Sequence, residues 1–215
     1  MSGRVVVVDF DGTVTETDTL DAVAEEFGDS AVYQHADAGL DAGRMSLHDV
    51  IRAEFEPVRA PLAEVVAWVV DHARIRPGFH ELVDAADRNG WRLVILSSGF
   101  HELIEPILER EGLGHVELIA NRIEPDPAGW RVVFRDEEPC TVCGEACKRS
   151  TVAALAGGSE VVYVGDGHSD RCAAEFADRT FATKGLATWL EERGRPFERF
   201  EDFHSIVRAL DRAAA

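Results

Sequence analysis

Val5-Val6-Val7-Val8-Asp9-Phe10-Asp11-Gly12-Thr13-Val14-Thr15 is the stretch of this 215-residue sequence that decides its fold. Four consecutive β-branched residues favour a strand that is buried on both faces, as in parallel sheets, and the strand ends where the carboxylates begin. Ligands bind at the carboxyl edge of open α/β sheets, so Asp9 and Asp11 stand where chemistry usually takes place. Asp-x-Asp-Gly is also common in turns after strands, and the rest of the chain has to decide between a site and a turn.

Composition and charge exclude several classes of protein. The formal net charge of −18 and the pI near 4.7 disfavour binding to nucleic acids and to anionic membranes. No apolar run approaches the ~20 residues that span a bilayer, and the first strand follows Met1-Ser2-Gly3-Arg4 without room for a signal peptide. We therefore expect a cytoplasmic protein with one sizeable domain and a smaller insertion.

A helical pattern replaces the strand pattern after Thr15. Helix-start signals occur at Asp18, at Ser46 and at Pro61, and apolar residues follow each of them at intervals of three and four. We expect this insertion to act as a lid over the site. The predicted domains are a helical cap over 16–75 and a catalytic core formed by 1–15 and 76–215.

Strands and helices alternate beyond the cap. Buried strands are expected over 91–96 and 161–164, a short strand over 180–182, and an antiparallel excursion over 116–120 and 130–134. This alternation predicts an α/β protein with a doubly wound, mostly parallel sheet of the Rossmann-like kind.

Six polar residues that could take part in chemistry lie at the ends of predicted strands or the starts of predicted helices. They are Asp9, Asp11, Ser97, Lys148, Asp166 and Asp170. This series resembles the haloacid dehalogenase-like phosphohydrolases, whose motifs are Asp-x-Asp-x-Thr after the first strand, a Ser or Thr after the second, a Lys, and a late acidic pair. The resemblance covers the whole core. It implies the fold of that family and the activity of a phosphatase.

Carboxylates gathered at one edge of a sheet repel one another and need a cation, and oxygen ligands of this kind suit Mg²⁺. The residues expected to hold the metal are Asp9, Asp11, Asp166 and Asp170. A carboxylate nucleophile can take a phosphoryl group and release it to water, and we assign this role to Asp9. Asp11 would protonate the leaving alcohol and later deprotonate the hydrolytic water.

Ser97 and Lys148 are expected to stabilise the phosphoryl group in transfer, the serine as a hydrogen-bond donor and the lysine as a point charge that also keeps Asp9 ionised. Ser97 is preferred over Ser98 on the register of the family motif. Lysine occurs in this chain only at positions 148 and 184, so Lys184 is the one rival. The further residues assigned to phosphate binding are Thr13, Ser98 and Gly99.

The helical insertion and Asp18 resemble the phosphoserine-phosphatase branch of the family. In those enzymes a glutamate at the position of Asp18 meets the substrate ammonium, and a cap arginine meets its carboxylate. Here the place of that arginine falls on Glu54, which would repel a carboxylate and disfavours phosphoserine unless Arg44 or Arg52 substitutes. The cap residues expected to contact substrate are Asp18, Arg44, His48, Arg52 and Phe55.

The segment Cys143-Gly144-Glu145-Ala146-Cys147-Lys148 is more similar to the methionine-salvage phosphatases. Those enzymes act on 2-hydroxy-3-keto-5-methylthiopentenyl-1-phosphate and carry a cysteine-rich stretch directly before the lysine, one residue shorter than here. The resemblance implies a small phosphorylated metabolite as substrate, with phosphoserine, a sugar phosphate or a vitamin phosphate as alternatives. A regulatory phosphate-binding module without turnover is the alternative from a different class.

The cysteines are Cys140, Cys143, Cys147 and Cys172, and the first three are bunched as Cys-x2-Cys-x3-Cys. Three interpretations stay open. The cluster can hold a structural Zn²⁺, with Cys172 or a histidine as the fourth ligand, or it can consist of thiols that only pack the loop before Lys148. A disulfide is the third interpretation, which a reducing compartment disfavours.

Overall fold

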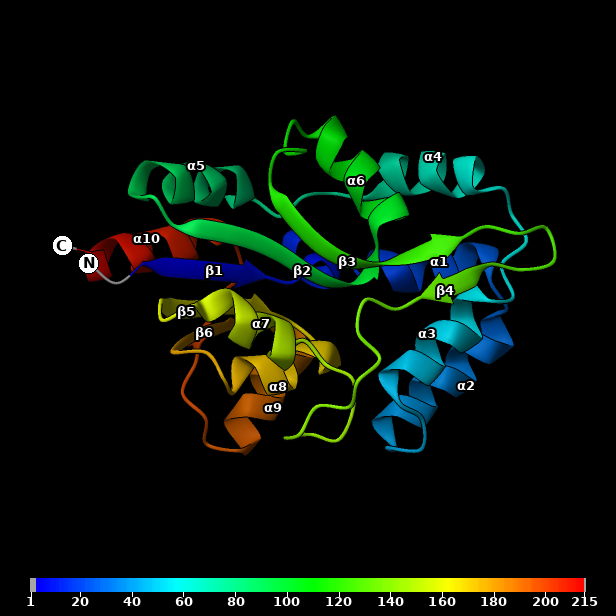
Figure 1. The fold of residues 1–215 in the computed structure, drawn as a ribbon. Helices are drawn as coiled ribbons and strands as arrows, with labels where there is room; N and C mark the ends of the chain where they lie inside the picture. The colour runs from blue at the N-terminus through cyan, green and yellow to red at the C-terminus, as the bar shows by residue number, and fades with distance from the viewer. Residues whose placement is uncertain (1–2, 215) are drawn as a thin grey trace.

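The central sheet of the computed structural model, which describes residues 3–214, has the strand order β4-β3-β2-β1-β5-β6-β7 (Figure 1). β1 (Arg4–Val8) lies between β2 (Arg92–Phe100) and β5 (Glu160–Gly165) and is parallel to both. The other strands are β3 (Glu117–Glu124), β4 (Arg131–Val133), β6 (Arg179–Ala182) and β7 (Glu198–Arg199). Among the described strand pairs only β3 and β4 are antiparallel. The prediction of a mostly parallel α/β sheet is confirmed.

The valines of β1 show why this strand is central. Val6 and Val8 belong to the hydrophobic cluster on one face of the sheet, and Val5 and Val7 belong to the cluster on the other face. Each of them is at most 4% exposed. β1 is therefore buried on both faces, as its continuous run of β-branched residues predicts.

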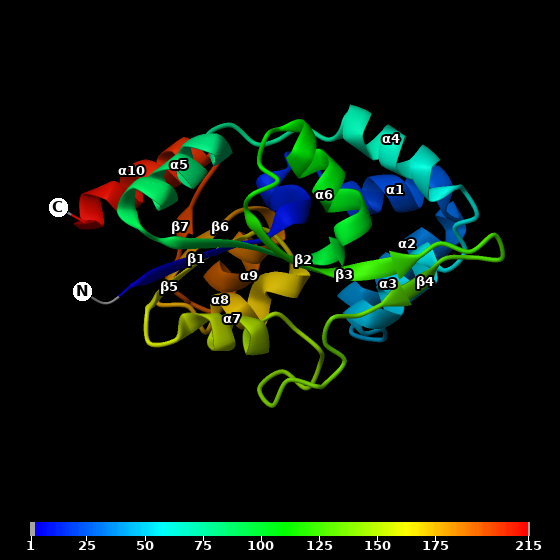
Figure 2. The ribbon, with the colours of Figure 1, turned by 45° about the horizontal axis from the view of Figure 1, so that its top comes forward.

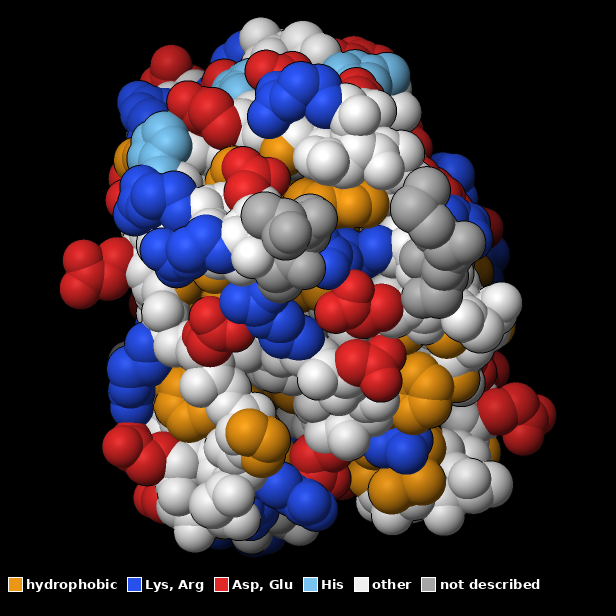
Figure 3. All heavy atoms as spheres, turned by 90° about the vertical axis from the view of Figure 1, so that its left-hand side faces the viewer, with side chains coloured by type: hydrophobic (Ala, Val, Ile, Leu, Met, Phe, Trp, Pro, Cys, Tyr) orange, Lys and Arg blue, Asp and Glu red, His pale blue; other side chains and the backbone are white. Residues whose placement is uncertain are grey.

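Helices cover both faces of the sheet (Figures 1 and 2). One face carries α5 (Phe79–Asn89), α6 (His101–Arg110) and α10 (Phe203–Ala214). The other carries α7 (Arg149–Ala156), α8 (Arg171–Ala174) and α9 (Lys184–Glu192). Acidic and basic side chains are interspersed on the face that carries the chain termini (Figure 3). Within residues 3–214, every helix is too short or too polar to cross a lipid bilayer.

The segment predicted as a cap forms α1 (Thr19–Phe27), α2 (Ser30–Asp41), α3 (Leu47–Phe55) and α4 (Leu62–His72). Asp18 caps α1, Ser46 forms a capping box with Asp49 at α3, and Pro61 precedes α4, as predicted. Thr15 and Ile75 form an antiparallel bridge where the segment joins the core. This bridge supports the predicted cap boundaries, which stay a prediction.

The cap helices share a hydrophobic cluster with the sheet. Val23, Ile51 and Val65 of the cap lie in the same cluster as Val6 and Val8 of β1. The ring of Phe55 is fully buried and packs edge-on against the ring of Phe100, with centroids 4.8 Å apart. The structure therefore places Phe55 between the cap and the core and not in the lining of a cavity, and its contact with substrate stays a prediction.

Arg76 holds the turn that follows β1. Its guanidinium donates to the carbonyl oxygens of Gly12 at 2.8 Å, Thr13 at 2.8 Å and Thr15 at 3.2 Å, and also to that of Glu201 at 3.1 Å. Three of these acceptors belong to the turn that carries Asp11, so Arg76 fixes its backbone.

We expect Arg76→Gln to lower the free energy of unfolding by roughly 1–3 kcal/mol, because several half-buried carbonyl groups lose a charged donor. Urea-induced unfolding followed by circular dichroism measures the change. Arg88→Gln, at an exposed position near the end of α5, is the matched control and should change stability by less than about 0.5 kcal/mol. Equal effects in the two variants would contradict a role for Arg76 in holding the turn.

Candidate active site

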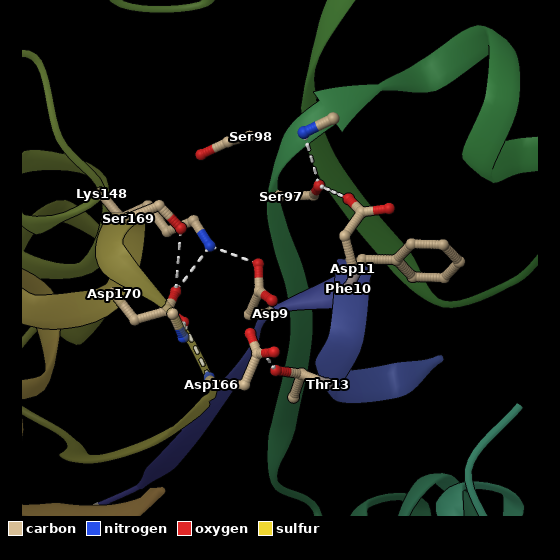
Figure 4. A network of polar contacts seen from close by, with 12 residues as sticks. Asp9, Phe10, Asp11, Thr13, Ser97, Ser98, Lys148, Asp166, Ser169 and Asp170 are labelled. Atoms are coloured by element: carbon tan, nitrogen blue, oxygen red, sulfur yellow. Dashed lines mark hydrogen bonds and ion pairs between the residues drawn. The ribbon is translucent and has the colours of Figure 1, made fainter. Parts of the chain in front are cut away.

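The carboxyl ends of β1, β2 and β5 bring the predicted site residues together (Figure 4). Asp9 follows β1, Ser97 lies near the end of β2, and Asp166 follows β5. Asp170 ends the short helix η2 (His168–Asp170), and Lys148 directly precedes α7. Residues that are far apart in the sequence thus share one edge of the sheet.

A buried lysine links two of the carboxylates. The Lys148 ammonium donates to Asp9 Oδ1 and, at 2.7 Å, to Asp170 Oδ1, and the Lys148 side chain is only 1% exposed. Burial lowers the pKa of Lys148, but the Asp170 and Asp9 carboxylates outweigh burial and hold that pKa above its usual value. Lys148 is therefore a permanent positive charge in the interior. Lys184, the rival lysine, is 44% exposed and lies 3.0 Å from Asp166 Oδ2.

Asp170 is the most strongly held carboxylate of the site. Its oxygens accept from Tyr163 Oη at 2.7 Å, from the backbone N–H of Asp166 at 2.9 Å and from that of Gly167 at 3.0 Å, in addition to Lys148. Burial raises the pKa of Asp170, but Lys148 and the Gly167 N–H outweigh burial and keep it below its usual value. Asp170 is therefore ionised at neutral pH and orients Lys148.

Asp9, Asp166 and Asp170 form a group whose carboxylate oxygens lie within 4.8 Å of one another. Burial and the Asp170 carboxylate raise the pKa of Asp9 well above its usual value, and the same two causes raise the pKa of Asp166. A cation placed among these oxygens would lower both pKa values, and hard oxygen donors suit Mg²⁺. The donor set therefore fits the metal that the sequence predicts.

The Asp11 side chain takes a different direction from the other aspartates. It accepts a hydrogen bond from Ser97 Oγ at 2.9 Å and another from Thr19 Oγ1, on the side away from Lys148 (Figure 4). The structure therefore does not bring the Asp11 carboxylate into the group of Asp9, Asp166 and Asp170, and its part in metal binding stays a prediction. Burial, with a smaller contribution from the Asp18 carboxylate, raises the pKa of Asp11 to about 7. An acid with this pKa can both donate and accept a proton near neutral pH.

Ser97 supports Asp11 in this structure rather than facing the cavities. Its hydroxyl donates to Asp11 and accepts from the backbone N–H of Gly99 at 2.7 Å, and the residue is fully buried. A Cβ on Gly99 would lie 2.7 Å from Asp11 Oδ2, so a larger residue there would displace the Asp11 carboxylate. Ser98 is the serine that lines the cavities of the site. Thr13, also predicted to bind phosphate, donates to Asp166 Oδ1 at 3.3 Å.

Two adjoining cavities open beside these residues, and Ser98 and His168 line both of them. The first, here called the acidic cavity, has a volume of about 190 Å³. Its charged lining residues are Asp9, Asp11, Asp18, Asp21, Glu54 and Asp166. The second, here called the arginine cavity, has a volume of about 260 Å³. Its basic lining residues are His48, Arg135, Lys148, His168 and Arg171.

Of the other cap residues predicted to contact substrate, some line these cavities and others lie on the surface. Asp18 lines the acidic cavity and His48 the arginine cavity. Arg52 lines neither and pairs with Glu137 at 3.5 Å. Arg44 is exposed and donates to the Ala38 carbonyl oxygen, so the structure does not bring it to the site.

The sequence motifs miss Asn121 and Arg135, which both line the arginine cavity. Asn121 donates to the Ser98 carbonyl oxygen at 2.7 Å and accepts from the backbone N–H of Arg135 at 3.1 Å. An asparagine inside the apolar pattern of β3 is the signal that indicates this position, because a buried amide needs partners. No comparable signal marks Arg135.

Comparison with known proteins gives consistent similarities. The profile of the family described as haloacid dehalogenase-like hydrolase matches residues 6–175. The polyol phosphate phosphatase PYP1 of Saccharomyces cerevisiae is 27% identical, with 100% of this chain and 95% of the relative covered. The 2-hydroxy-3-keto-5-methylthiopentenyl-1-phosphate phosphatase of Brevibacillus brevis is 29% identical, with 98% and 96% covered. A solved structure of a phospho-aspartyl intermediate analogue of phosphoserine phosphatase has a TM-score of 0.76 at 20% identity, covering 97% of this chain and 99% of that chain, which shows a shared fold.

We expect Lys148→Met to lower the free energy of unfolding by roughly 3–5 kcal/mol, because it leaves two buried carboxylates without their cation. Lys184→Met removes the other lysine, whose side chain is 44% exposed, and should cost less than about 1 kcal/mol. Urea-induced unfolding of both variants at neutral pH, without divalent cations, measures the difference. Similar losses in the two variants would show that Lys148 has no special part in holding the carboxylates.

The pKa of Asp11 predicts how stability depends on pH in metal-free protein. Since the folded state raises this pKa from 3.8 to about 7, the folded protein binds the proton more tightly than the unfolded chain. The stabilisation is complete below pH ~4 and is lost as the pH rises through ~7. We expect Asp11→Asn to reduce the slope of unfolding free energy against pH by up to ~1.4 kcal/mol per pH unit in this window.

Urea titrations between pH 4.5 and pH 8 in EDTA measure this slope. Asp84→Asn, at an exposed position of α5, is the control and should retain the slope of the unsubstituted protein. If the unfolding free energy of Asp11→Asn has the same slope against pH as that of the control, the raised pKa of Asp11 is refuted.

Proposed function

The chain belongs to the haloacid dehalogenase-like hydrolase family and is a phosphatase, and we propose that it hydrolyses a small phosphorylated metabolite with Mg²⁺ through an aspartyl-phosphate on Asp9. The observation that carries the proposal is the buried Lys148, which contacts Asp9 and Asp170 at the carboxyl edge of the sheet. A lysine there lowers the pKa of Asp9, against the effect of burial, and would meet the negative charge of the transferring phosphoryl group.

Asp9 would attack phosphorus with one carboxylate oxygen while the bond to the leaving alcohol breaks. Asp11 would give its proton to that alcohol, and would then take a proton from the water that attacks the aspartyl-phosphate, releasing inorganic phosphate. Its pKa of about 7 suits both steps. Asp9 and Asp166 would hold the metal, with Asp170 assisting. Bound Mg²⁺ neutralises phosphate oxygens and the clustered carboxylates.

The acidic cavity supports a leaving group that carries no carboxylate. Asp21 and Glu54 line it together with Asp18, whose pKa burial raises to about 7. Negative charge on these carboxylates would repel the carboxylate of phosphoserine, whereas their oxygens can accept hydrogen bonds from hydroxyl groups. The same cavity has an apolar side that suits a thioether or alkyl tail. Its apolar lining residues are Leu20, Leu40, Leu47, Val50 and Ile51.

This combination favours 2-hydroxy-3-keto-5-methylthiopentenyl-1-phosphate as the substrate, which has hydroxyl and keto groups near the phosphate and a methylthio end. The relative from Brevibacillus brevis is named for that activity. A polyol phosphate is the second candidate, favoured by the number of carboxylates that can bind hydroxyl groups and by the similarity to the yeast polyol phosphate phosphatase.

The first test measures phosphate release from a panel of substrates, with Mg²⁺ and with EDTA. The panel contains the methylthiopentenyl phosphate, polyol phosphates, pyridoxal phosphate and phosphoserine. We expect Mg²⁺-dependent turnover that Asp9→Asn reduces at least about 10⁴-fold, because it removes the nucleophile. Asp84→Asn, exposed and remote, should keep the rate. Turnover that survives in Asp9→Asn would refute the aspartyl-phosphate, and vanadate binding without any turnover would indicate a binding module.

Glu54→Gln tests the selection against phosphoserine. Removing one cavity carboxylate should narrow the ratio of kcat/KM between the best neutral substrate and phosphoserine by roughly 5- to 50-fold, equivalent to ~1–2 kcal/mol of relieved repulsion. Glu56→Gln, two residues further along at an exposed position, should leave the ratio unchanged. An unchanged ratio in Glu54→Gln would remove the electrostatic argument for a substrate without a carboxylate.

A further inference from the structure

The four cysteines meet in one cluster outside the group of catalytic carboxylates. The Sγ atoms of Cys140, Cys143, Cys147 and Cys172 all lie within 4.8 Å of one another. Three of them come from the segment between β4 and α7, and Cys172 lies in α8, so the cluster joins two parts of the fold (Figures 1 and 2). We propose that these four thiolates bind one structural Zn²⁺.

Sulfur distances fit a tetrahedral ion. With Zn–S bonds of about 2.3 Å, two ligand sulfurs on one tetrahedral zinc lie about 3.8 Å apart. The Sγ atoms of Cys140 and Cys172 are 3.9 Å apart. A disulfide requires about 2.05 Å, so the cluster is arranged for a shared ion rather than for a sulfur–sulfur bond. A four-iron cluster would have to hold the sulfurs much farther apart, which leaves a single ion.

Packing of apolar thiols does not explain this cluster. Cys143 is exposed, Cys140 and Cys147 are half-buried, and only Cys172 is buried. The segment 134–148 contains no helix or strand, and connections of more than about 12–15 residues without secondary structure are uncommon in compact domains and usually have a function. A metal ion bound by the thiolates of this segment would order it without a hydrophobic core.

The backbone around Cys140 already has the form of a metal-binding turn. The N–H of Gly144 donates to the Cys140 carbonyl oxygen at 2.8 Å, and the N–H of Cys140 donates to that of Glu145 at 2.9 Å. The N–H of Val142 donates to Cys140 Sγ at 3.4 Å. Donors of this kind stabilise a thiolate, and Cys-x2-Cys turns are typical of structural zinc sites.

The charge of the site is compatible with its surroundings. Four thiolates and one Zn²⁺ carry a net charge of −2, and binding releases the thiol protons to solvent. Arg135 and Arg171 line the arginine cavity together with three of the cysteines. Arg149 donates to the Cys172 carbonyl oxygen at 3.2 Å. Basic groups thus lie around the proposed anion.

The proposed zinc would order two residues of the active site. Cys147 directly precedes Lys148, and Cys172 follows Asp170 by two positions. An ion that holds both cysteines therefore joins the two segments whose Lys148 Nζ and Asp170 Oδ1 are 2.7 Å apart. This proposal depends on the cysteine geometry and not on the identity of the substrate or the nucleophile.

The test is the metal content of the full-length protein, purified without chelator and without a metal-affinity resin, by mass spectrometry. We expect about one Zn²⁺ per chain and four titratable thiols after denaturation in EDTA. Cobalt-substituted protein should show the intense visible bands of tetrahedral thiolate coordination. Less than about a tenth of an equivalent of zinc would overturn the proposal, both if all four thiols are free and if two of them have formed a disulfide. One equivalent of iron in place of zinc would also overturn it.

A matched pair of variants locates the ion. Cys143→Ser removes the most exposed ligand and should lower zinc retention against a competing chelator at least tenfold. Val142→Ser changes the neighbouring side chain, which is 58% exposed, and should retain zinc like the unsubstituted protein. Zinc retained equally by both variants would place the ion elsewhere and overturn the assignment.

Discussion

The burial of several carboxylates close together is the constraint on which the rest of this structure depends. Asp9, Asp166 and Asp170 lie close together at the edge of the sheet, where water cannot screen their charges. Lys148 contacts Asp9 and Asp170, and Lys184 contacts Asp166. The pKa values of Asp9 and Asp166 still lie above their usual range, because burial and then the Asp170 carboxylate outweigh the two ammonium groups. A cation bound among these carboxylates would lower both pKa values, and in the proposed mechanism it would favour the ionised form of Asp9 that attacks phosphorus.

The fold supplies the geometry through neighbouring strands. β1 is parallel to β2 and β5, so residues that follow the ends of these strands converge without any long-range signal in the sequence. The carboxylates also need room to approach the neighbouring backbone, which small residues provide. A Cβ on Gly12 would lie 2.3 Å from Asp166 Oδ2, and one on Gly99 would lie 2.7 Å from Asp11 Oδ2. A Cβ on Gly165 would likewise lie 2.5 Å from Asp170 Oδ2, so glycines give the carboxylates room to approach the backbone.

The order of motifs along the sequence predicts the sheet, the cap helices with caps at Asp18 and Ser46, and the meeting of Asp9 with Lys148 and Asp170. The direction of a side chain is harder to predict, because it depends on partners that come from other elements. Asp11 turns toward Thr19 and Ser97 for this reason. Three elements, α2, α9 and β7, also lie outside the sequence prediction. In α2 many small and polar residues weaken the periodicity, and α9 begins at Lys184, a non-glycine residue with a positive φ of 43°.

The proposed function assigns phosphate chemistry and substrate selection to different parts of the chain. The groups assigned to the chemistry stand at strand ends and at the starts of α7 and α8, whereas α3 contributes Val50, Ile51 and Glu54 to the acidic cavity. The next residue of α3, Phe55, packs against Phe100 of β2 in the shared hydrophobic cluster. This packing fixes the helix relative to the site, so the residues of its cavity face can change without moving the catalytic carboxylates. Such a separation explains how relatives with a similar fold and the same phosphoryl chemistry can differ in the alcohol that they release.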